Sequence, residues 1–331
     1  MNVIVVGVGA FGRNHARVYK ELEQQGEPLR LLGVVDRDVA RADAVAREFN
    51  CRSFGSLEQL LTTHSEVQAA SVTVPTSEHL ATARTLMESG VDVLVEKPLA
   101  TSLGEADELV RLATEKKRIA QVGHLERFNP AVRATIPLIT QPMFFEVHRM
   151  SVFTPRSLDI DVVLDLMIHD LDIVLSFVKS PVEEVRAVGL PILSGKTDIA
   201  NVRIEFASGC VANFTASRVS TKRIRKLRFF QPRQYISIDY GRQDVIAFTV
   251  GDSNPQATPS VNPQIGMVKP PVTSEEPLRA ELRAFLDAVR RRSTPVVTLE
   301  DGRRALALAL NIVTDIHQHG SRINLEKLTR S

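Results

Sequence analysis

A β-branched run that leads into a glycine-rich turn restricts the fold of this chain more than any other stretch. Residues 3–6 are Val-Ile-Val-Val, and Gly7, Gly9 and Gly12 follow in the turn before a helix expected at 13–25. This order of strand, turn and helix is typical of dinucleotide binding. Gly7 allows the tight turn, Gly9 lets the backbone approach a pyrophosphate, and Gly12 lets the helix pack against the strand. The sequence therefore predicts a nucleotide-binding unit at its start.

Strand and helix patterns then alternate, which indicates a parallel sheet with helices on both faces. We expect an α/β fold with an NAD-binding Rossmann domain, a doubly wound parallel sheet, at 1–122. An α+β domain with a mostly antiparallel sheet follows at 123–331, for substrate binding and oligomerisation. In the first domain we expect strands at 31–35, 68–74, 91–95 and 119–122, and helices at 39–48, 56–61, 77–89 and after a Ser102–Glu105 capping box.

Asp36 lies at the end of the second expected strand. An acidic side chain there binds both ribose hydroxyls of an adenosine and repels a 2′-phosphate, so it favours NAD over NADP. Arg37 offers such a phosphate a counter-charge, or is a solvated arginine that stacks on the adenine. We therefore expect NAD as the cofactor.

A helix expected at 160–178 is apolar nearly all round except for one polar stripe. Buried carboxylates beside a histidine have shifted pKa values suited to moving protons. The same stripe on a solvent-facing helix would have no chemical role. We expect the buried alternative, and hence the chemistry, on this helix. At 3.6 residues per turn the stripe consists of Asp161, Asp165, His169, Asp172 and Ser176.

Strand patterns dominate the second domain. One face of an antiparallel sheet is commonly exposed unless a second subunit covers it, so we expect a homo-oligomer that joins at the apolar face of 201–217. The proline-rich stretch 251–277 is typical of a long loop, and the basic run 222–228 of a solvated face rather than a phosphate site. Expected strands are 143–152, 201–206, 210–217, 225–230, 235–240 and 245–250, and expected helices are 278–291 and 299–319.

Composition indicates a folded protein with a small-molecule partner. The 331 residues are 44% hydrophobic and 24% charged, and a net charge of +2 gives no bias toward nucleic acid or an anionic membrane. Cys51 and Cys210 are too few for a disulfide framework, and neither a transmembrane stretch nor a secretory signal is present, so we expect the cytoplasm. We expect no bound metal, because His317 and His319 lack a second pair of ligand-type neighbours.

Three motifs together resemble the Gfo/Idh/MocA family of sugar oxidoreductases: the glycine turn, the Glu-Lys-Pro at 96–98, and Asp165 followed by His169. The resemblance covers nearly the whole chain. It implies that Lys97, Asp165 and His169 form the catalytic set. The glycine turn, the acidic strand end and the resemblance together give a cofactor set of Gly7, Gly9, Phe11, Gly12, Asp36, Arg37, Pro75, Thr76, His79 and Glu96.

Residues 122–130 and 161–170 look similar to one branch of that family, the UDP-N-acetylglucosamine 3-dehydrogenases of lipid A assembly. One departure is that Val162 and Val163 replace two glycines common in the family. The resemblance implies a sugar-nucleotide substrate and an aminotransferase as the metabolic partner that consumes the product. The first stretch follows the last strand of the nucleotide domain, at an edge where ligands bind. The expected substrate contacts are Lys97, Arg127, Asn129, Asp165 and His169.

We expect NAD-dependent oxidation of a sugar secondary hydroxyl, foremost the 3-hydroxyl of UDP-N-acetylglucosamine. His169 takes the proton, Lys97 stabilises the developing alkoxide and Asp165 orients the imidazole, or Lys97 and His169 exchange roles. Alternatives are the same chemistry on a UDP-uronic acid, an inositol or a free sugar, and a non-catalytic NAD-binding sensor. A uronic acid needs a cation for its carboxylate, for which the candidates are Arg127, Arg149 and Arg156.

Overall fold

The computed structural model describes residues 1–154, 160–251 and 265–322. The chain divides into two units: unit 1 is Met1–Leu125 with Glu276–Leu306, and unit 2 is Glu126–Glu275 with Ala307–Ser331. The sequence analysis placed a single boundary after residue 122 and assigned everything beyond it to the second domain. The structure differs, because residues 276–306 return to unit 1.

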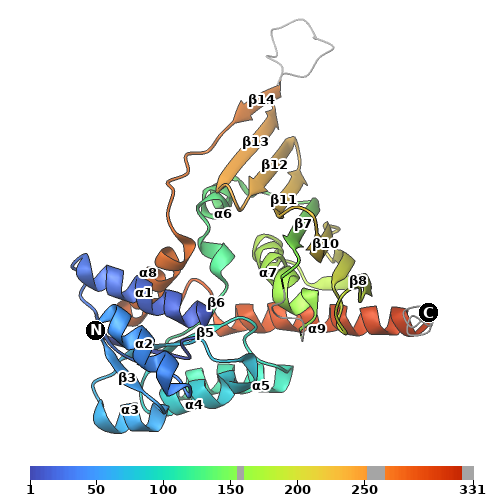
Figure 1. Cartoon of the computed structure of the whole chain (residues 1–331). Helices are drawn as coiled ribbons and strands as arrows, with labels where there is room; N and C mark the ends of the chain where they lie inside the picture. Colours follow the sequence, from blue (N-terminus) through green and yellow to red (C-terminus); the bar gives the residue numbers. More distant parts are fainter. Residues whose placement is uncertain (155–159, 252–264, 323–331) are drawn as a thin grey trace, which may run out of the picture. The chain divides into compact units, whose positions relative to one another are not determined.

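Unit 1 contains a sheet with helices around it (Figure 1). The sheet has six strands in the order β3-β2-β1-β4-β5-β6. Its neighbouring strands pair in parallel, so the predicted doubly wound sheet is confirmed. The sequence analysis missed β3, because its three residues are too few to show a pattern. The strands are β1 (Asn2–Val6), β2 (Arg30–Val35), β3 (Arg52–Phe54), β4 (Ala69–Val72), β5 (Asp92–Glu96) and β6 (Ala120–Gly123).

The helices between these strands begin and end close to the predicted residues. Ser102 caps the helix after β5, since its hydroxyl accepts a hydrogen bond from the Glu105 amide at 3.3 Å. The Glu105 carboxylate accepts from the Thr101 amide at 2.9 Å, one residue before the position that a capping box uses. The helices are α1 (Ala10–Gln24), α2 (Val39–Phe49), α3 (Leu57–Thr63), the 3-10 helix η1 (Thr76–Glu78), α4 (His79–Glu88) and α5 (Leu103–Glu115).

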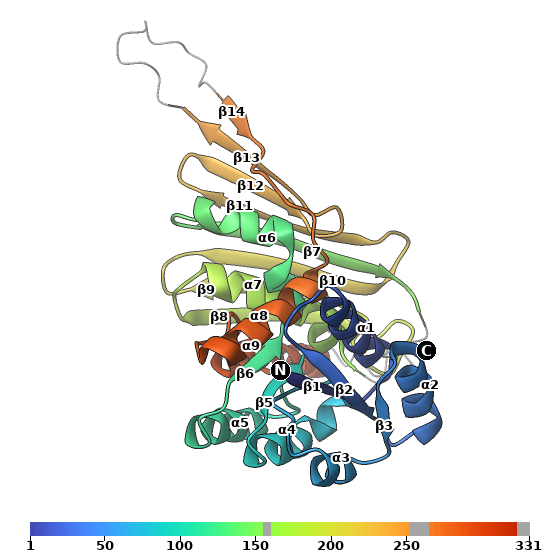
Figure 2. The same ribbon diagram turned by 90° about the vertical axis from the view of Figure 1, so that its left-hand side faces the viewer.

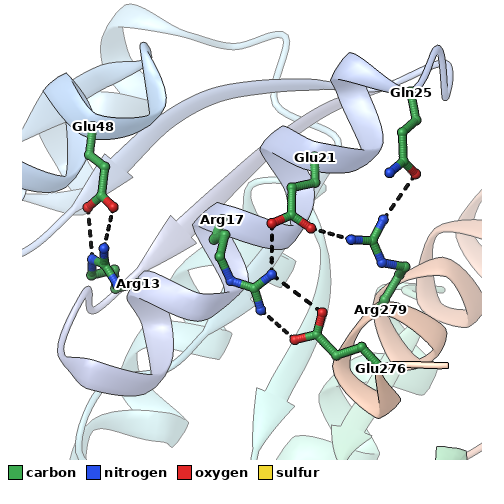
Figure 3. A network of polar contacts seen from close by, with 7 residues as sticks. All are labelled: Arg13, Arg17, Glu21, Gln25, Glu48, Glu276 and Arg279. Atoms are coloured by element: carbon green, nitrogen blue, oxygen red, sulfur yellow. Dashed lines mark hydrogen bonds and ion pairs between the residues drawn. The ribbon is translucent and has the colours of Figure 1, made fainter. Parts of the chain in front are cut away.

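Helix α8 (Pro277–Arg291) is the element that brings the chain back to unit 1. Its buried face includes Leu282 and Phe285, which share one hydrophobic core with side chains of β1 and α1. Ion pairs also join α1 to the start of α8 (Figure 3). These pairs are Arg17 with Glu276 and Arg279 with Glu21.

Unit 2 contains an eight-stranded sheet in the order β14-β13-β12-β11-β7-β10-β9-β8 (Figure 2). Neighbouring strands pair antiparallel, apart from β7 and β10, so the mostly antiparallel sheet is confirmed. The sequence analysis missed β8 and β14. It had assigned β14 to the loop 251–277, of which residues 252–264 lie outside the described residues. The strands are β7 (Phe144–Val152), β8 (Val182–Leu190), β9 (Ile199–Phe206), β10 (Val211–Ser220), β11 (Ile224–Gln231), β12 (Gln234–Asp239), β13 (Asp244–Val250) and β14 (Ile265–Val268).

The helix expected at 160–178 begins as a π-helix, η4 (Val163–Met167), and continues as α7 (Ile168–Phe177). The Ile168 amide bonds to the Val163 carbonyl, five residues back, so the first turn is wider than an α-helical turn. No helix in the described part of the chain is long and apolar enough to span a membrane. The remaining helices are η2 (Leu125–Phe128), α6 (Pro130–Thr135), η3 (Ile136–Leu138) and α9 (Leu299–Arg322), the last beginning in unit 1.

The sheet of unit 2 has a buried and an exposed face. Along β9, Val202 and Ile204 are buried, whereas Asn201 and Arg203 are exposed. The expected apolar exposed face on 201–217 is therefore wrong, because the apolar side chains of these strands fill the core of unit 2. Exposed apolar side chains occur on other strands of the sheet, at Val188, Leu190, Ile224, Phe230, Ile265, Met267 and Val268.

Candidate active site

The turn between β1 and α1 contains two glycines at positions where a side chain does not fit. Gly7 has a φ of +87°, and a Cβ on it would lie 2.7 Å from the Val74 amide nitrogen. A Cβ on Gly12 would lie 1.9 Å from the Gly7 carbonyl oxygen, so α1 packs closely against the turn. Gly9 has open space around its Cα. The turn thus combines close packing with one open approach, as pyrophosphate binding requires.

A pocket of about 790 Å³ lies at this turn. It is formed in part by the carboxyl ends of β1, β2 and β4, the sheet edge where ligands bind in doubly wound folds, and its volume is typical of small-molecule sites. The predicted cofactor residues that line it are Gly7, Gly9, Phe11, Asp36, Arg37 and Pro75. The predicted residues Gly12, Thr76, His79 and Glu96 are not among its lining residues.

The Asp36 carboxylate is held in a fixed direction at the end of β2. Its Oδ2 accepts the Val8 amide at 2.9 Å and its Oδ1 accepts the Asp38 amide at 3.0 Å. The residue is only 8% exposed. A carboxylate held by two backbone amides keeps its orientation and presents its remaining lone pairs to a ligand. This arrangement fits the ribose hydroxyls of an adenosine.

Two arginines border the same pocket. The Arg37 side chain is 82% exposed and pairs with Glu78 at 2.8 Å. Arg41, which the sequence analysis did not single out, pairs with Asp38 at 3.0 Å and lies 3.4 Å from Asp36. Its signal in the sequence was weak, because it is one of two exposed arginines on α2.

The N-terminus of α1 suits an anion. Its N-cap residue is Gly9, which has no side chain to bond the first backbone amides. Those amides and the helix dipole favour a negative group. Together with the pocket and with Asp36, the residues present fit the adenosine and pyrophosphate of a nicotinamide cofactor.

His79 lies behind the loop that we expected to flank the cofactor. The side chain is buried, with Nε2 at 3.0 Å from the Val74 carbonyl oxygen and Nδ1 at 3.0 Å from that of Pro98. Burial lowers the pKa of His79, although these carbonyl contacts oppose the shift. The ring joins the segment after β4 to the segment after β5. The sequence analysis expected a cofactor contact here, whereas both ring nitrogens are engaged in holding the loop.

Glu96 ends β5 directly before Lys97. Its Oε2 accepts the Lys97 amide at 3.2 Å, and its Oε1 lies 3.2 Å from Nε2 of His15. A Cβ on Gly123 would lie 2.5 Å from Glu96 Oε1, so the glycine makes room for the carboxylate. The sequence analysis missed His15. Its position three residues after Gly12, on the buried side of α1, was the available signal.

Asp165 and His169 lie in unit 2, on η4 and α7, and both are half-buried. Other carboxylates of the predicted stripe have structural partners. Asp161 accepts the Thr197 amide at 3.0 Å, and Asp172 binds an arginine. The stripe therefore divides into structural carboxylates at its ends and the Asp165–His169 pair in the middle.

Arg127 and Asn129 are engaged inside unit 2. Arg127 binds Asp172 through two hydrogen bonds of 2.6 and 2.9 Å. Asn129 is buried, donates to Glu126 at 3.2 Å and to the Tyr240 carbonyl at 3.1 Å, and caps α6 with its own side-chain oxygen. The sequence analysis expected both residues to contact the substrate. The structure gives Asn129 an internal role instead, because its amide has no group left to offer.

Arg149 forms a buried ion cluster with two carboxylates. It binds Asp170 at 2.6 and 2.9 Å and Glu126 at 3.1 Å. Burial opposes the charge of Arg149, but Asp170 and Glu126 outweigh it and raise the pKa of the guanidinium. Arg149 is thus an internal counter-ion and not the cation for a uronic acid. Arg156, another candidate for that role, lies outside the described residues.

A Rossmann unit with a dinucleotide turn, joined in one chain to a strand-rich unit with an aspartate–histidine pair, defines a nicotinamide-dependent oxidoreductase. Residues 1–124 match the oxidoreductase family with an NAD-binding Rossmann fold, and residues 141–236 match the GFO/IDH/MocA C-terminal domain. The chain belongs to the Gfo/Idh/MocA oxidoreductase family.

Named relatives include dehydrogenases of a sugar nucleotide and of an inositol. The UDP-N-acetylglucosamine 3-dehydrogenase of Acidithiobacillus ferrooxidans is 36% identical over 314 residues, covering 94% of this chain and 96% of the relative. A solved structure of that enzyme has a TM-score of 0.86 at 35% identity, covering 96% of this chain and 97% of that one. The scyllo-inositol 2-dehydrogenase (NAD(+)) of Bacillus subtilis is 29% identical over 231 residues, 65% of this chain and 67% of the relative. The chain is therefore a dehydrogenase that uses a nicotinamide cofactor and acts on a small molecule.

Proposed function

We propose that the protein oxidises the 3-hydroxyl of UDP-N-acetylglucosamine to a ketone. The observation that carries the proposal is the likeness to a named UDP-N-acetylglucosamine 3-dehydrogenase, which extends over 94% of this chain at 36% identity and into both units. The inositol dehydrogenase relative matches a shorter part of the chain at lower identity. A sugar nucleotide is therefore the better supported substrate.

The proposed reaction uses the side chains of Lys97, Asp165 and His169. A bound nicotinamide cofactor supplies the hydride acceptor. His169 takes the proton of the substrate hydroxyl, and Asp165, one helical turn before it, orients the imidazole or a neighbouring substrate hydroxyl. Lys97 hydrogen-bonds the same oxygen and stabilises the negative charge that develops on it. Lys97 and His169 are both protonatable groups, so the reverse assignment of base and stabiliser predicts the same reaction.

We propose NAD rather than NADP as the cofactor. The fixed Asp36 carboxylate fits two free ribose hydroxyls and repels a 2′-phosphate. Arg41 and Arg37 are already paired with carboxylates at the pocket. Their charge is thus partly neutralised before any ligand binds.

The product of the proposed reaction fits a place in lipid A biosynthesis. A 3-keto sugar nucleotide is a substrate for an aminotransferase, which would replace the ketone with an amine. We propose such an enzyme as the metabolic partner, the cytoplasm as the location, and a homo-oligomer as the assembly. NAD and sugar nucleotides as substrates support the location.

The test is a panel of substrates incubated with NAD and the purified protein. The panel contains UDP-N-acetylglucosamine, its uronic acid, scyllo-inositol and a free hexose, and turnover is followed by the absorbance of the reduced nicotinamide. Because oxidation of an alcohol by NAD is uphill at neutral pH, a 3-ketosugar aminotransferase is added to remove the product. For UDP-N-acetylglucosamine alone we expect reduced nicotinamide to form and, with the aminotransferase and its amino donor present, mass spectrometry to show the hydroxyl replaced by an amino group. Without the aminotransferase, the small amount of product should lack two hydrogen atoms. Oxidation of an inositol or a hexose in its place would overturn the substrate and leave the reaction class intact.

A further inference from the structure

A chain of buried polar side chains runs through unit 1 behind Glu96. Nδ1 of His15 lies 3.0 Å from the Ser71 hydroxyl, which in turn lies 2.9 Å from the Tyr19 hydroxyl. Nε2 of His15 lies 3.2 Å from Glu96 Oε1. His15, Tyr19 and Ser71 are each 0% exposed. These four residues, which come from α1, β4 and β5, are called the His15 chain below.

The protons available in the His15 chain indicate which group donates and which group accepts in each contact. Burial raises the pKa of the Tyr19 hydroxyl, which therefore keeps its proton and donates it to Ser71. The Ser71 hydroxyl, having accepted from Tyr19, gives its own proton to Nδ1 of His15. A neutral imidazole that accepts at Nδ1 carries its proton on Nε2, where Glu96 Oε1 is the acceptor at hand. In this arrangement the Tyr19 and Ser71 hydroxyls each donate to the next group of the chain. Nε2 of His15 and Oε1 of Glu96, two buried atoms that form no other hydrogen bond in the described part of the chain, then face each other at 3.2 Å.

The end of the His15 chain reaches the main chain of Lys97. Glu96 has one oxygen toward His15 and the other on the Lys97 amide, at 3.2 Å in both cases. The position of Gly123 leaves no space for a side chain there, since a Cβ would lie 2.7 Å from the Glu96 carboxyl carbon. The carboxylate is therefore confined between His15, the Lys97 amide and the backbone of β6.

Two further buried groups belong to this region. Glu281 on α8 is 0% exposed, and burial, with the charge of Glu96 as a second cause, raises its pKa well above the ordinary value. Burial thus favours the protonated form of Glu281. Gln121 on β6 donates to the Glu281 main-chain carbonyl at 3.4 Å. The carboxyl group beside His15 is that of Glu96.

We propose that His15 is a positioning residue for the dehydrogenation. Its Nε2 proton, placed by Ser71 and Tyr19, directs the Glu96 carboxylate and through it the main chain that carries Lys97. This inference rests on the proposed role of Lys97. Because Nε2 of His15 lies 3.2 Å from Oε1 of Glu96 in a space closed by Gly123, we expect loss of this contact to let the carboxylate turn away from the Lys97 amide.

The first test is independent of turnover. Long-range proton–nitrogen correlation spectra of the cofactor-free protein report which nitrogen of each neutral histidine is protonated. We expect His15 as the Nε2-protonated tautomer in the wild type and in Tyr19→Phe, where the Ser71 hydroxyl still donates. In Ser71→Ala we expect a mixture of tautomers. A wild-type His15 protonated at Nδ1 would overturn the proposal, whatever the substrate proves to be.

The second test uses amide side chains as partial mimics of the imidazole. Asn reaches about as far as Nδ1 and Gln about as far as Nε2, so His15→Asn loses the donor to Glu96 while His15→Gln retains it. We expect His15→Asn to lower kcat by about 10- to 100-fold with a small change in KM for NAD, and His15→Gln to recover most of the loss. Equal effects of the two variants would assign His15 a packing role only and overturn the proposal.

The matched control is His64→Gln. His64 is also a buried histidine of unit 1 that pairs with a glutamate, at 2.8 Å from Glu66, but its partners are Arg52 and Glu66 rather than Glu96. We expect its kcat to stay near the wild-type value. If His64→Gln lowers kcat as much as His15→Asn, loss of a buried histidine is sufficient to explain both and the positioning role is rejected.

Discussion

At the scale of single residues, the burial of Glu281 predicts how the free energy of unfolding depends on pH. This prediction can be tested without a substrate. The folded-state pKa of Glu281 is raised by burial and by Glu96, so the folded protein binds a proton that the unfolded chain releases above its ordinary pKa. The stabilisation that comes from this proton is therefore full below the ordinary pKa of a glutamate. Between that pKa and the raised pKa of the folded state, the free energy of unfolding falls by about 1.4 kcal/mol for each pH unit.

Glu281→Gln removes this proton and nearly preserves shape. We expect the free energy of unfolding of the variant, measured with urea between about pH 5 and about pH 8, to fall less with pH than that of the wild type. The advantage of the variant should grow as the pH rises. Parallel curves for the two proteins would show that Glu281 ionises normally in the folded state.

We expect Asp36 to determine the choice between the two nicotinamide cofactors. Asp36→Ala removes the negative charge that faces the ribose, while Arg41 and Arg37 remain at the pocket. We expect the wild type to prefer NAD and the variant to show a smaller or reversed preference in kcat/KM. Arg37→Ala, which leaves the carboxylate in place, is the control and should keep the preference for NAD. A wild type that prefers NADP would contradict the assignment.

Lys97 and His169 are the residues whose loss should affect chemistry more than cofactor binding. We expect Lys97→Met and His169→Ala each to lower kcat by roughly 100-fold or more. Calorimetry should show NAD affinity close to that of the wild type for both variants, because the pocket at the glycine turn is untouched. Variants that both retain activity within a few-fold would show that the chemistry lies elsewhere.

At the scale of elements, two networks of ion pairs differ in burial. Arg149 is 3% exposed and holds the buried carboxylates of Asp170 and Glu126 between β7, α7 and η2. Arg279 links α8 to α1 from a position nearer the solvent (Figure 3). Removing one partner of a buried pair leaves an uncompensated charge, whereas removing one partner of an exposed pair does not.

The matched variants are Arg149→Met and Arg279→Met. We expect the first to lower the free energy of unfolding by about 3 to 5 kcal/mol and the second by about 1 kcal/mol or less. Urea denaturation monitored by circular dichroism measures both. Similar losses in the two variants would mean that water hydrates the ion cluster of Arg149.

Most elements of unit 1 could be predicted from sequence because they carry a local signal, although the three-residue β3 was missed and α8 was assigned to the other domain. The glycine turn requires a positive φ at Gly7, and a β-branched run precedes it. The π-turn of η4 was not predicted, since the sequence there shows only the apolar and polar pattern of an ordinary helix. The contacts of Arg127 with Asp172 and of Asn129 with the Tyr240 carbonyl were not predicted either, because contacts between residues far apart in the chain leave no mark in the order of the sequence.

At the scale of the whole molecule, the sequence showed which helices are amphipathic but not which core they enter. Helix α8 has a regular apolar face, and it follows a long stretch of unit 2, so the sequence analysis assigned it there. In the structure Leu282 and Phe285 fill the core of unit 1. Periodicity identifies a buried face and says nothing about its partner.

Assembly is the remaining property at this scale, and a row of apolar side chains across the sheet of unit 2 bears on it. Phe144, Phe230, Tyr235, Phe248 and Met267 occupy paired positions on five adjacent strands. Phe230 and Met267 are 38% and 65% exposed, and the Tyr235 and Phe248 rings stack at 5.8 Å. Exposed apolar surface of this extent on a sheet is typical of an interface between proteins.

We therefore expect a homo-oligomer that uses this row, which replaces the face of 201–217 first considered. Phe230→Asp places a charge within the row and should dissociate the assembly at micromolar concentration, because a desolvated and unpaired charge opposes association. Val296→Asp, at a side chain of unit 1 that is 56% exposed, is the control and should leave the assembly unchanged. Light scattering coupled to gel filtration reports the mass of each form. A wild-type protein that elutes as a monomer at that concentration would show that the row is covered by something other than a second copy.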